Sequence, residues 1–257
     1  MFNTNKVGRP VCKVIGGEDN GEVIYLDPDV KDTKGAKGKL KKNYFKDLEI
    51  KDGIFQQVPD TTKERECGMI VGASGSGKSY YTNNYIKEYK SVHKKNPVYF
   101  FSVLEEDKSI NKKMIQRVKI DEGLITEPLT INDLTNSLVI FDDVEMVKDK
   151  AIKVALFDLI NSILTTGRHT NTSIIMTVHY PTGKYLKDLL NECHWFVYFP
   201  FGSNRSTNYV LENYIGIDKK EIKHIKDLGS RWACVFKNYP QCVLTEHNLF
   251  SLSSLDL

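Results

Sequence analysis

Residues 67–80 read CGMIVGASGSGKSY, and the part from Gly72 to Ser79 fits the pattern G-x-x-x-x-G-K-[ST]. It follows a short apolar run and opens a segment with helical periodicity, which is the context that a phosphate-binding loop requires. The glycines allow backbone angles at which successive N–H groups face phosphates, and the helix N-terminus adds a positive end. We therefore predict that ATP is bound by nine consecutive residues: Gly72, Ala73, Ser74, Gly75, Ser76, Gly77, Lys78, Ser79 and Tyr80.

Two side chains of this loop have distinct predicted roles, and a second motif supplies acids for the same site. Lys78 is expected on the β- and γ-phosphates, and the Ser79 hydroxyl is expected to ligate Mg²⁺. The run LVIFDD at 138–143 places acids at the tip of an apolar strand, where a carboxylate is costly unless something such as hydrated Mg²⁺ occupies it. We assign Asp142 to Mg²⁺ through water and Asp143 to the attacking water, with Glu145 as a weaker candidate for the base.

Alternating apolar runs and amphipathic segments predict the fold. Continuous apolar runs are typical of parallel strands covered on both faces, and alternation of strands with helices calls for a mostly parallel sheet. Two final strands, 231–238 and 241–248, are expected to form a hairpin turning at Tyr239-Pro240. The predicted strands are 67–72, 97–103, 137–143, 172–178 and 194–200, and the predicted helices are 78–94, 105–119, 148–166, 183–192, 204–215 and 218–228.

The first sixty residues differ from the rest in composition. Eight lysines fall between Lys31 and Lys51, and the clearest loop is KDTKGAKGKLKKN at 31–43. Such a basic stretch can attract a polyanion, but more often it is simply a solvated segment. We expect a basic, loosely structured extension over residues 1–60 and an ATPase domain over residues 61–257.

Composition excludes several classes of protein. The five cysteines form no CxxC pair and no zinc-like spacing with histidine, which indicates reduced thiols in a cytosol-like compartment. No apolar run approaches the length of a transmembrane helix, and the N-terminus lacks the apolar core of a signal peptide. We therefore expect a protein that is neither secreted nor inserted in a membrane.

The segment TTGRHTNTSIIMTVHYP at 165–181 narrows the class of ATPase. A predicted helix ends near Gly167, Arg168 follows, and the next strand carries His179 at its tip. An arginine at such a turn can reach the nucleotide of a neighbouring subunit, and a polar strand tip can contact the γ-phosphate. The alternative for Arg168 is a surface side chain that caps the last carbonyls of the helix.

Together, GASGSGKS, LVIFDD and Arg168 followed by a polar strand tip resemble the FtsK–HerA superfamily of DNA-pumping ATPases, within it the genome-packaging ATPases of large double-stranded DNA viruses and their relatives. The resemblance covers about residues 54–200. It implies a RecA-like P-loop fold, a homo-oligomeric ring of five or six subunits, and Mg²⁺-dependent ATP hydrolysis coupled to translocation of duplex DNA. It also implies Arg168 as a finger acting in trans and His179 as the γ-phosphate sensor.

Two positions depart from the pattern of that superfamily. The sensor is usually Gln where this chain has His179, and the second acid is often Glu where this chain has Asp143. A neutral imidazole can donate or accept a proton, so the sensor role is retained with a dependence on pH. A shorter acid requires a tighter site to hold the water.

The sequence therefore predicts a viral DNA-packaging ATPase with ATP and Mg²⁺ as cofactors, and with duplex DNA and capsid vertex proteins as partners. The expected location is the assembly site in the host cytoplasm, or the virion. Three alternatives stay open: a helicase or coupling protein with the same motor core, a nucleoside or nucleotide kinase, and a non-catalytic assembly protein. A kinase needs an arginine-bearing lid, for which only Arg205 and Arg231 lie downstream.

Overall fold

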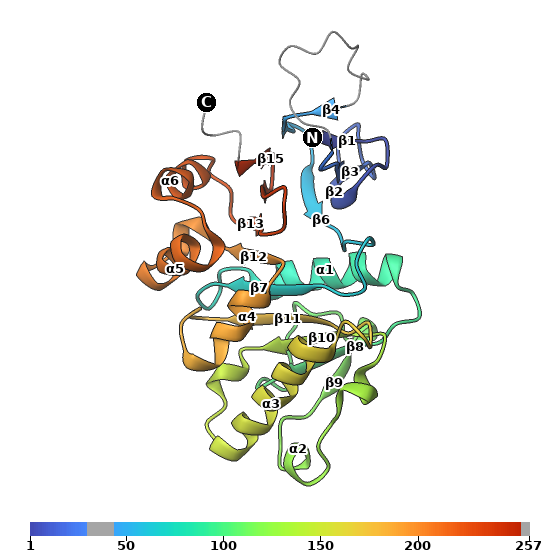
Figure 1. The fold of residues 1–257 in the computed structure, drawn as a ribbon, viewed down its shortest axis with the longest axis vertical. Coiled ribbons are helices and arrows are strands. Elements are labelled where there is room, and N and C mark those ends of the chain that lie inside the picture. The colour runs from blue at the N-terminus through green and yellow to red at the C-terminus, as the bar shows by residue number, and fades with distance from the viewer. Residues whose placement is uncertain (30–43, 253–257) are drawn as a thin grey trace.

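A ten-stranded sheet forms the centre of the computed structural model, which describes residues 1–29 and 44–252 (Figure 1). Its strand order is β5-β15-β14-β13-β12-β7-β11-β10-β8-β9. The six strands from β12 to β9 run parallel, and the four at the other side pair antiparallel. The parallel strands are β12 (Trp195–Tyr198), β7 (Cys67–Val71), β11 (Ser173–Val178), β10 (Leu138–Asp142), β8 (Val98–Ser102) and β9 (Gln116–Val118).

Helices cover both faces of the parallel half, as continuous apolar strands require. On one face, α1 (Lys78–Val92) buries Tyr81, Tyr85 and Ile86 in one apolar core. On the other face, α3 (Lys150–Thr166) and α4 (Lys187–Glu192) bury leucine and isoleucine side chains in a second core, together with residues of the short α2 (Gly123–Thr126). The predicted mostly parallel α/β fold is confirmed.

The order of the parallel strands decides where a site can form. Strand β7 leads into the loop at residues 72–77 and then into α1, and it lies between β12 and β11. Strand β10 pairs with β11 on one side and with β8 on the other. Asp142 therefore aligns with Thr177 of β11 and with Ser102 of β8. Because carboxyl ends of parallel strands meet at one edge, the loop and the acids after β10 lie together there.

The C-terminal part of the chain contains the predicted hairpin. Strands β13 (Ala233–Phe236) and β14 (Cys242–Thr245) pair antiparallel, and β15 (Asn248–Ser251) adds a further strand. Between β12 and β13 lie α5 (Arg205–Val210), a π-helical turn (Leu211–Ile215) and α6 (Lys219–Asp227). No helix within the described ranges is long and apolar enough to span a membrane.

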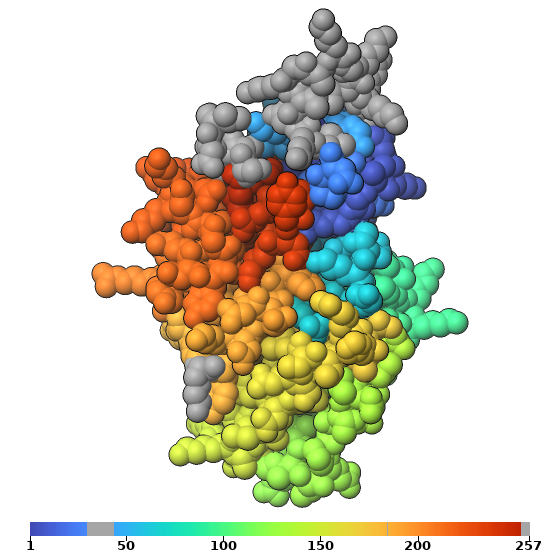
Figure 2. Space-filling view, viewed as in Figure 1, coloured from blue at the N-terminus to red at the C-terminus, as the bar shows by residue number. Residues whose placement is uncertain are grey.

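The N-terminal residues are more ordered than we expected. They form a five-stranded antiparallel sheet that packs on the α1 side of the main sheet: β4 (Tyr44–Phe45), β1 (Phe2–Asn3), β3 (Val23–Leu26), β2 (Arg9–Ile15) and β6 (Ile54–Gln57). Strand β5 (Asp47–Glu49) pairs with β15 of the main sheet. Figure 2 accordingly shows the C-terminal strands, in red, beside the N-terminal residues, in blue. The lysine-rich loop predicted at 31–43 lies outside the described residues, and the division near residue 60 stays a prediction.

The helix predicted at 105–119 is wrong. This segment contains a loop, a 3-10 turn (Lys112–Met114) and the edge strand β9. The apolar residues Ile110, Met114 and Ile115 pack against the core on the α1 side without forming a helix, and the Asn111 side chain accepts from the Lys113 N–H, which caps the start of the short turn. The Arg117 guanidinium stacks on the Phe100 ring, and its N–H donates to the Leu104 carbonyl, which ties the edge strand to β8.

Candidate active site

A cavity of about 540 Å³ lies at the carboxyl edge of the parallel strands. It is lined by seven of the nine residues predicted to bind ATP. Three further predicted catalytic residues also line it: Asp142, Asp143 and His179. The structure thus brings motifs that are far apart in the sequence into one site. Its walls comprise Ala73, Ser74, Gly75, Gly77, Lys78, Ser79, Tyr80, Val103, Leu104, Asp107, Ser109, Asp142, Asp143, Met146 and His179.

The two remaining residues of the loop, Gly72 and Ser76, do not line the cavity but shape it. A Cβ at Gly72 would lie 2.4 Å from the Ser76 hydroxyl and 2.6 Å from the Phe199 ring, so glycine alone fits there. Gly75 and Gly77 have φ angles of 75° and 111°, a region that other residues rarely adopt. The loop thus holds a curved backbone that side chains would forbid.

The start of α1 provides a place for anionic phosphates. The helix begins at Lys78, and no side chain caps its first N–H groups. Those N–H groups and the positive end of the helix are therefore available to a phosphate. The Lys78 ammonium is buried, and it donates to the Gly72 carbonyl at 2.9 Å, which holds it over the loop.

Asp142 is buried and rigidly oriented by its two neighbouring strands. The Ser102 hydroxyl of β8 donates to one carboxylate oxygen at 2.9 Å, and the Thr177 hydroxyl of β11 donates to the other at 2.6 Å. A buried carboxylate needs such partners, because burial without them costs several kcal/mol. Sequence reasoning identified the acid but not these two hydroxyls, whose positions depend on the strand register.

Thr177→Val should show how much the hydrogen bond from the Thr177 hydroxyl to Asp142 contributes to the stability of the fold. Valine keeps the branched shape of the strand residue but leaves one oxygen of Asp142 without its donor, which should lower the free energy of unfolding by about 1–3 kcal/mol. Urea unfolding measures the change. Thr165→Val, at an exposed position of α3, is the matched control and should change stability by less than about 0.5 kcal/mol. Equal losses in the two variants would show that the hydroxyl does not support Asp142.

Lys78, Asp143 and His179 form one connected group. Asp143 lies at a φ of 50°, which turns its carboxylate back toward the loop. One of its oxygens is 3.6 Å from the Lys78 Nζ, and the other is 3.0 Å from the His179 Nε2. The Nδ1 of His179 is 3.4 Å from the same ammonium. Two predicted catalytic side chains therefore contact Lys78 directly.

The acids after β10 are partly withdrawn from solvent. Burial raises the pKa of Asp143; Lys78 and His179 act against this increase, and the Asp142 carboxylate adds to it. Burial also raises the pKa of Glu145, but Glu145 does not line the cavity. Instead, the Glu145 carboxylate accepts from the His179 backbone N–H at 3.0 Å. This contact favours Asp143 over Glu145 as the group facing the attacking water.

A further acid, Asp107, was not identified from the sequence. It lines the cavity and accepts a hydrogen bond from the Ser79 side chain. Partial burial alone would raise the pKa of Asp107, but the hydrogen bonds from Ser79 and Ser109 outweigh it, so the pKa is lowered. The sequence predicts a helix for this segment, and in a helix Asp107 would have no particular relation to the phosphate loop.

Arg168 lies away from this cavity, in the turn after α3. It is exposed, and within the described residues its guanidinium forms no hydrogen bond or ion pair. The alternative of a helix cap does not apply, because Arg65 fills that place: its guanidinium donates to the Ile163 carbonyl and, at 2.7 Å, to the Leu164 carbonyl. Arg168 is therefore free to act outside its own chain, and its role stays a prediction.

The donors at the site suit Mg²⁺. This ion prefers hard oxygen ligands in an octahedral arrangement and keeps several waters. The Ser79 hydroxyl and the carboxylates of Asp107 and Asp142 provide such oxygens, and Asp143 Oδ1 is buried without a hydrogen-bond donor. Ser79 and Asp142 would hold the ion, which would offset phosphate charge.

A relative establishes the family of the chain. Over 255 residues the chain is 34% identical to the uncharacterized protein V3 of Sputnik virophage, and the match covers 98% of this chain and 99% of that protein. The chain belongs to the V3 family. No family model matches this V3-family protein.

Two solved structures match much of the chain. The cytoplasmic domain of the type VII secretion ATPase EccC from Thermomonospora curvata matches with a TM-score of 0.53 at 11% identity, over 78% of this chain and 28% of that one. The genome-packaging NTPase B204 of Sulfolobus turreted icosahedral virus 2 matches with a TM-score of 0.48 at 16% identity, over 72% and 96%. At this identity the likeness to EccC shows a shared fold. The V3-family chain thus resembles the FtsK–HerA ATPases in its motifs and has the fold of a P-loop ATPase.

Proposed function

We propose that this V3-family protein is a Mg²⁺-dependent ATPase that moves duplex DNA, and that it packages a viral genome into a preformed capsid. One observation carries the first part of the proposal: Lys78, Asp142, Asp143 and His179 converge on one cavity beneath the phosphate loop. A protein that only binds nucleotide has no need of two oriented acids at the γ-phosphate end. This arrangement favours hydrolysis.

The residues have complementary roles in that reaction. Lys78 and the N–H groups of the loop hold the phosphates, and Ser79 with Asp142 holds Mg²⁺, which offsets the charge that develops on the transferred group. Asp143 accepts a hydrogen bond from the attacking water and orients it. His179 contacts Asp143 at 3.0 Å, so its imidazole can couple the position of this acid to the γ-phosphate.

The cavity lacks an arginine, which favours a motor with a shared site. Each arginine of the chain has a place elsewhere: Arg9 contacts the Asn238 and Pro240 carbonyls, Arg65 caps α3, Arg117 ties β9 to β8, Arg168 lies in the turn after α3, Arg205 is the first residue of α5 and Arg231 pairs with Glu246. None lines the cavity. A kinase lid built from Arg205 or Arg231 therefore has no support, whereas Arg168 of a neighbouring subunit in a ring would complete the site.

The choice of DNA as the moved polymer rests on the viral origin of the V3 relative and on the motif resemblance to viral packaging ATPases. EccC, which shares the fold, is a secretion ATPase, so the fold alone does not choose between DNA and protein. Capsid vertex proteins would anchor the ring, and the assembly site in the host cytoplasm is its expected location.

The proposal is tested by ATP hydrolysis with and without duplex DNA. Linear duplex of unrelated sequences should raise the rate of phosphate release, and the effect should fade with increasing salt, because a packaging motor grips phosphates rather than bases. Nucleosides added as acceptors should remain unphosphorylated. Hydrolysis that duplex DNA leaves unchanged would contradict DNA translocation and favour a protein substrate, and phosphorylated nucleosides would show a kinase.

A further inference from the structure

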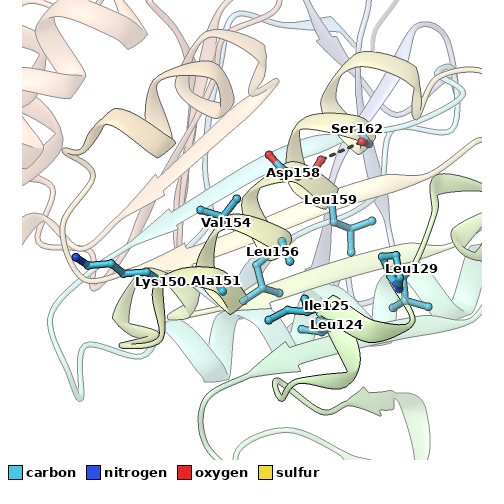
Figure 3. A pocket seen from close by; sticks show the side chains of 12 residues that line it. Leu124, Ile125, Leu129, Lys150, Ala151, Val154, Leu156, Asp158, Leu159 and Ser162 are labelled. Carbon is cyan, nitrogen blue, oxygen red and sulfur yellow. Dashed lines mark hydrogen bonds between the residues drawn. The ribbon is translucent and has the colours of Figure 1, made fainter.

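An apolar groove of about 690 Å³ lies between α2 and the outer side of α3, and it shares no lining residue with the nucleotide cavity (Figure 3). Leu124 and Ile125 of α2 lie opposite Leu156 and Leu159 of α3, Val154 also lines the groove, and Lys150 lies at one end. Ile125 is 45% exposed and Val154 is 47% exposed. A groove with such exposed apolar walls is typical of an interaction surface.

A row of exposed residues along one side of α3 leads from the groove to Arg168. Exposed residues recur at intervals of three and four, which places them in one stripe: Ala151, Val154, Asp158, Asn161, Thr165 and Arg168. At 1.5 Å per residue, the seventeen residues of α3 extend about 25 Å. If Arg168 enters the ATP cavity of a second copy, the stripe must lie along the rim of that cavity.

The rim offers a segment of matching chemistry. Val103 and Leu104 line the cavity mouth with 42% and 53% of their surfaces exposed, and Glu105 follows them. Neither Glu105 nor Lys150 forms an ion pair within the described residues. The segment Val103–Glu105 thus offers two exposed apolar side chains followed by an acid. It is complementary to the groove, which is apolar and has Lys150 at one end.

We propose that the groove between α2 and α3 receives the segment Val103–Glu105 of a second copy of this chain. Leu104 lies against Val154 and Ile125, and Glu105 reaches Lys150. This contact joins two different surfaces, so it repeats from copy to copy and closes a ring when the rotation permits. The inference rests on the proposed ring with Arg168 acting in trans, and it names the surfaces that hold the ring together.

Disulfide cross-linking tests the pairing. All five natural cysteines are buried, so exposed cysteines introduced by substitution react selectively. A chain carrying both Leu104→Cys and Val154→Cys should give a ladder of linked chains on mild oxidation. An equal mixture of the two single variants should stop at linked pairs, because each copy then offers one reactive partner.

Val92→Cys combined with Leu104→Cys is the matched control. Val92 is 46% exposed at the end of α1, close to the exposure of Val154 but outside the groove. No ladder is expected from it. A ladder of equal yield from the control pair, or no ladder from Leu104→Cys with Val154→Cys, would overturn the inference.

A charged side chain introduced into the groove allows a second test, which measures sedimentation and does not depend on cross-linking. Val154→Glu should shift the sedimentation of the assembled protein toward the single chain, whereas Val92→Glu should leave it unchanged. Identical sedimentation of both variants and the wild type, including a single chain in every case, would contradict the interface. DNA-stimulated hydrolysis by the wild type is scored separately: a ladder without stimulation would retain the interface and reject translocation, and stimulation without a ladder would do the reverse.

Discussion

Lys78→Ala is expected to abolish ATP hydrolysis and to weaken ATP binding. The Lys78 ammonium contacts the Gly72 carbonyl, Asp143 and His179, so it is the buried cation nearest to where the phosphates bind. Its removal deletes the charge on the β- and γ-phosphates and leaves two acids facing an anionic nucleotide. Removing a single preorganised donor at such a site costs about 10²–10³ in kcat, and the loss of a full charge should reach at least that value.

The measurements are phosphate release and the binding of a fluorescent ATP analogue. Lys87→Ala is the control, because Lys87 lies on the same helix with an exposed side chain that donates to Asn84. Lys87→Ala should retain wild-type hydrolysis and binding. Near-normal hydrolysis by Lys78→Ala would mean that the loop at residues 72–79 does not hold the reacting phosphates.

Arg168→Ala is expected to bind ATP normally and to hydrolyse it very slowly. The cavity of each chain keeps its loop, Lys78 and both acids, so binding is unchanged. Hydrolysis should fall by about 10³–10⁵, which is the contribution of an arginine finger supplied by a neighbouring subunit. The same two assays, phosphate release and analogue binding, separate these effects.

Arg205→Ala is the matched control, since Arg205 is likewise exposed beside a helix terminus, at the first residue of α5. It should hydrolyse ATP at the wild-type rate. If Arg168→Ala retained wild-type hydrolysis and Arg205→Ala lost it, the finger would be Arg205, and the stripe along α3 would no longer be tied to catalysis.

Local patterns explain which parts of the fold could be predicted. The buried strands β7, β10 and β11 are continuous apolar runs, and α3 carries an apolar side at helical spacing, so their sequences specify them with little help from distant residues. The phosphate loop follows from the spacing of Gly72, Gly77 and Lys78. These elements bring Asp142 and His179 to one edge, and that edge could be deduced from the alternation of strands and helices.

Long-range pairing explains what could not be predicted. Strand β5 pairs with β15 across about 200 residues, and β1 pairs with β3 and β4 through strands of two to four residues. Such short strands carry too few side chains for a period to be read. The position of Asp107 beside Ser79 and the capping of α3 by Arg65 likewise depend on contacts that no local spacing indicates.

A mixture of two inactive variants tests most directly the claim that each ATP site is shared between neighbouring copies. In a Lys78→Ala subunit Arg168 is intact, and in an Arg168→Ala subunit the phosphate loop is intact. Random co-assembly at equal amounts makes about a quarter of the heterologous interfaces complete. We expect the mixture to hydrolyse ATP well above the sum of the separate variants, with a maximum near equal amounts. Co-assembled mixtures whose hydrolysis never exceeds that sum at any ratio would contradict it.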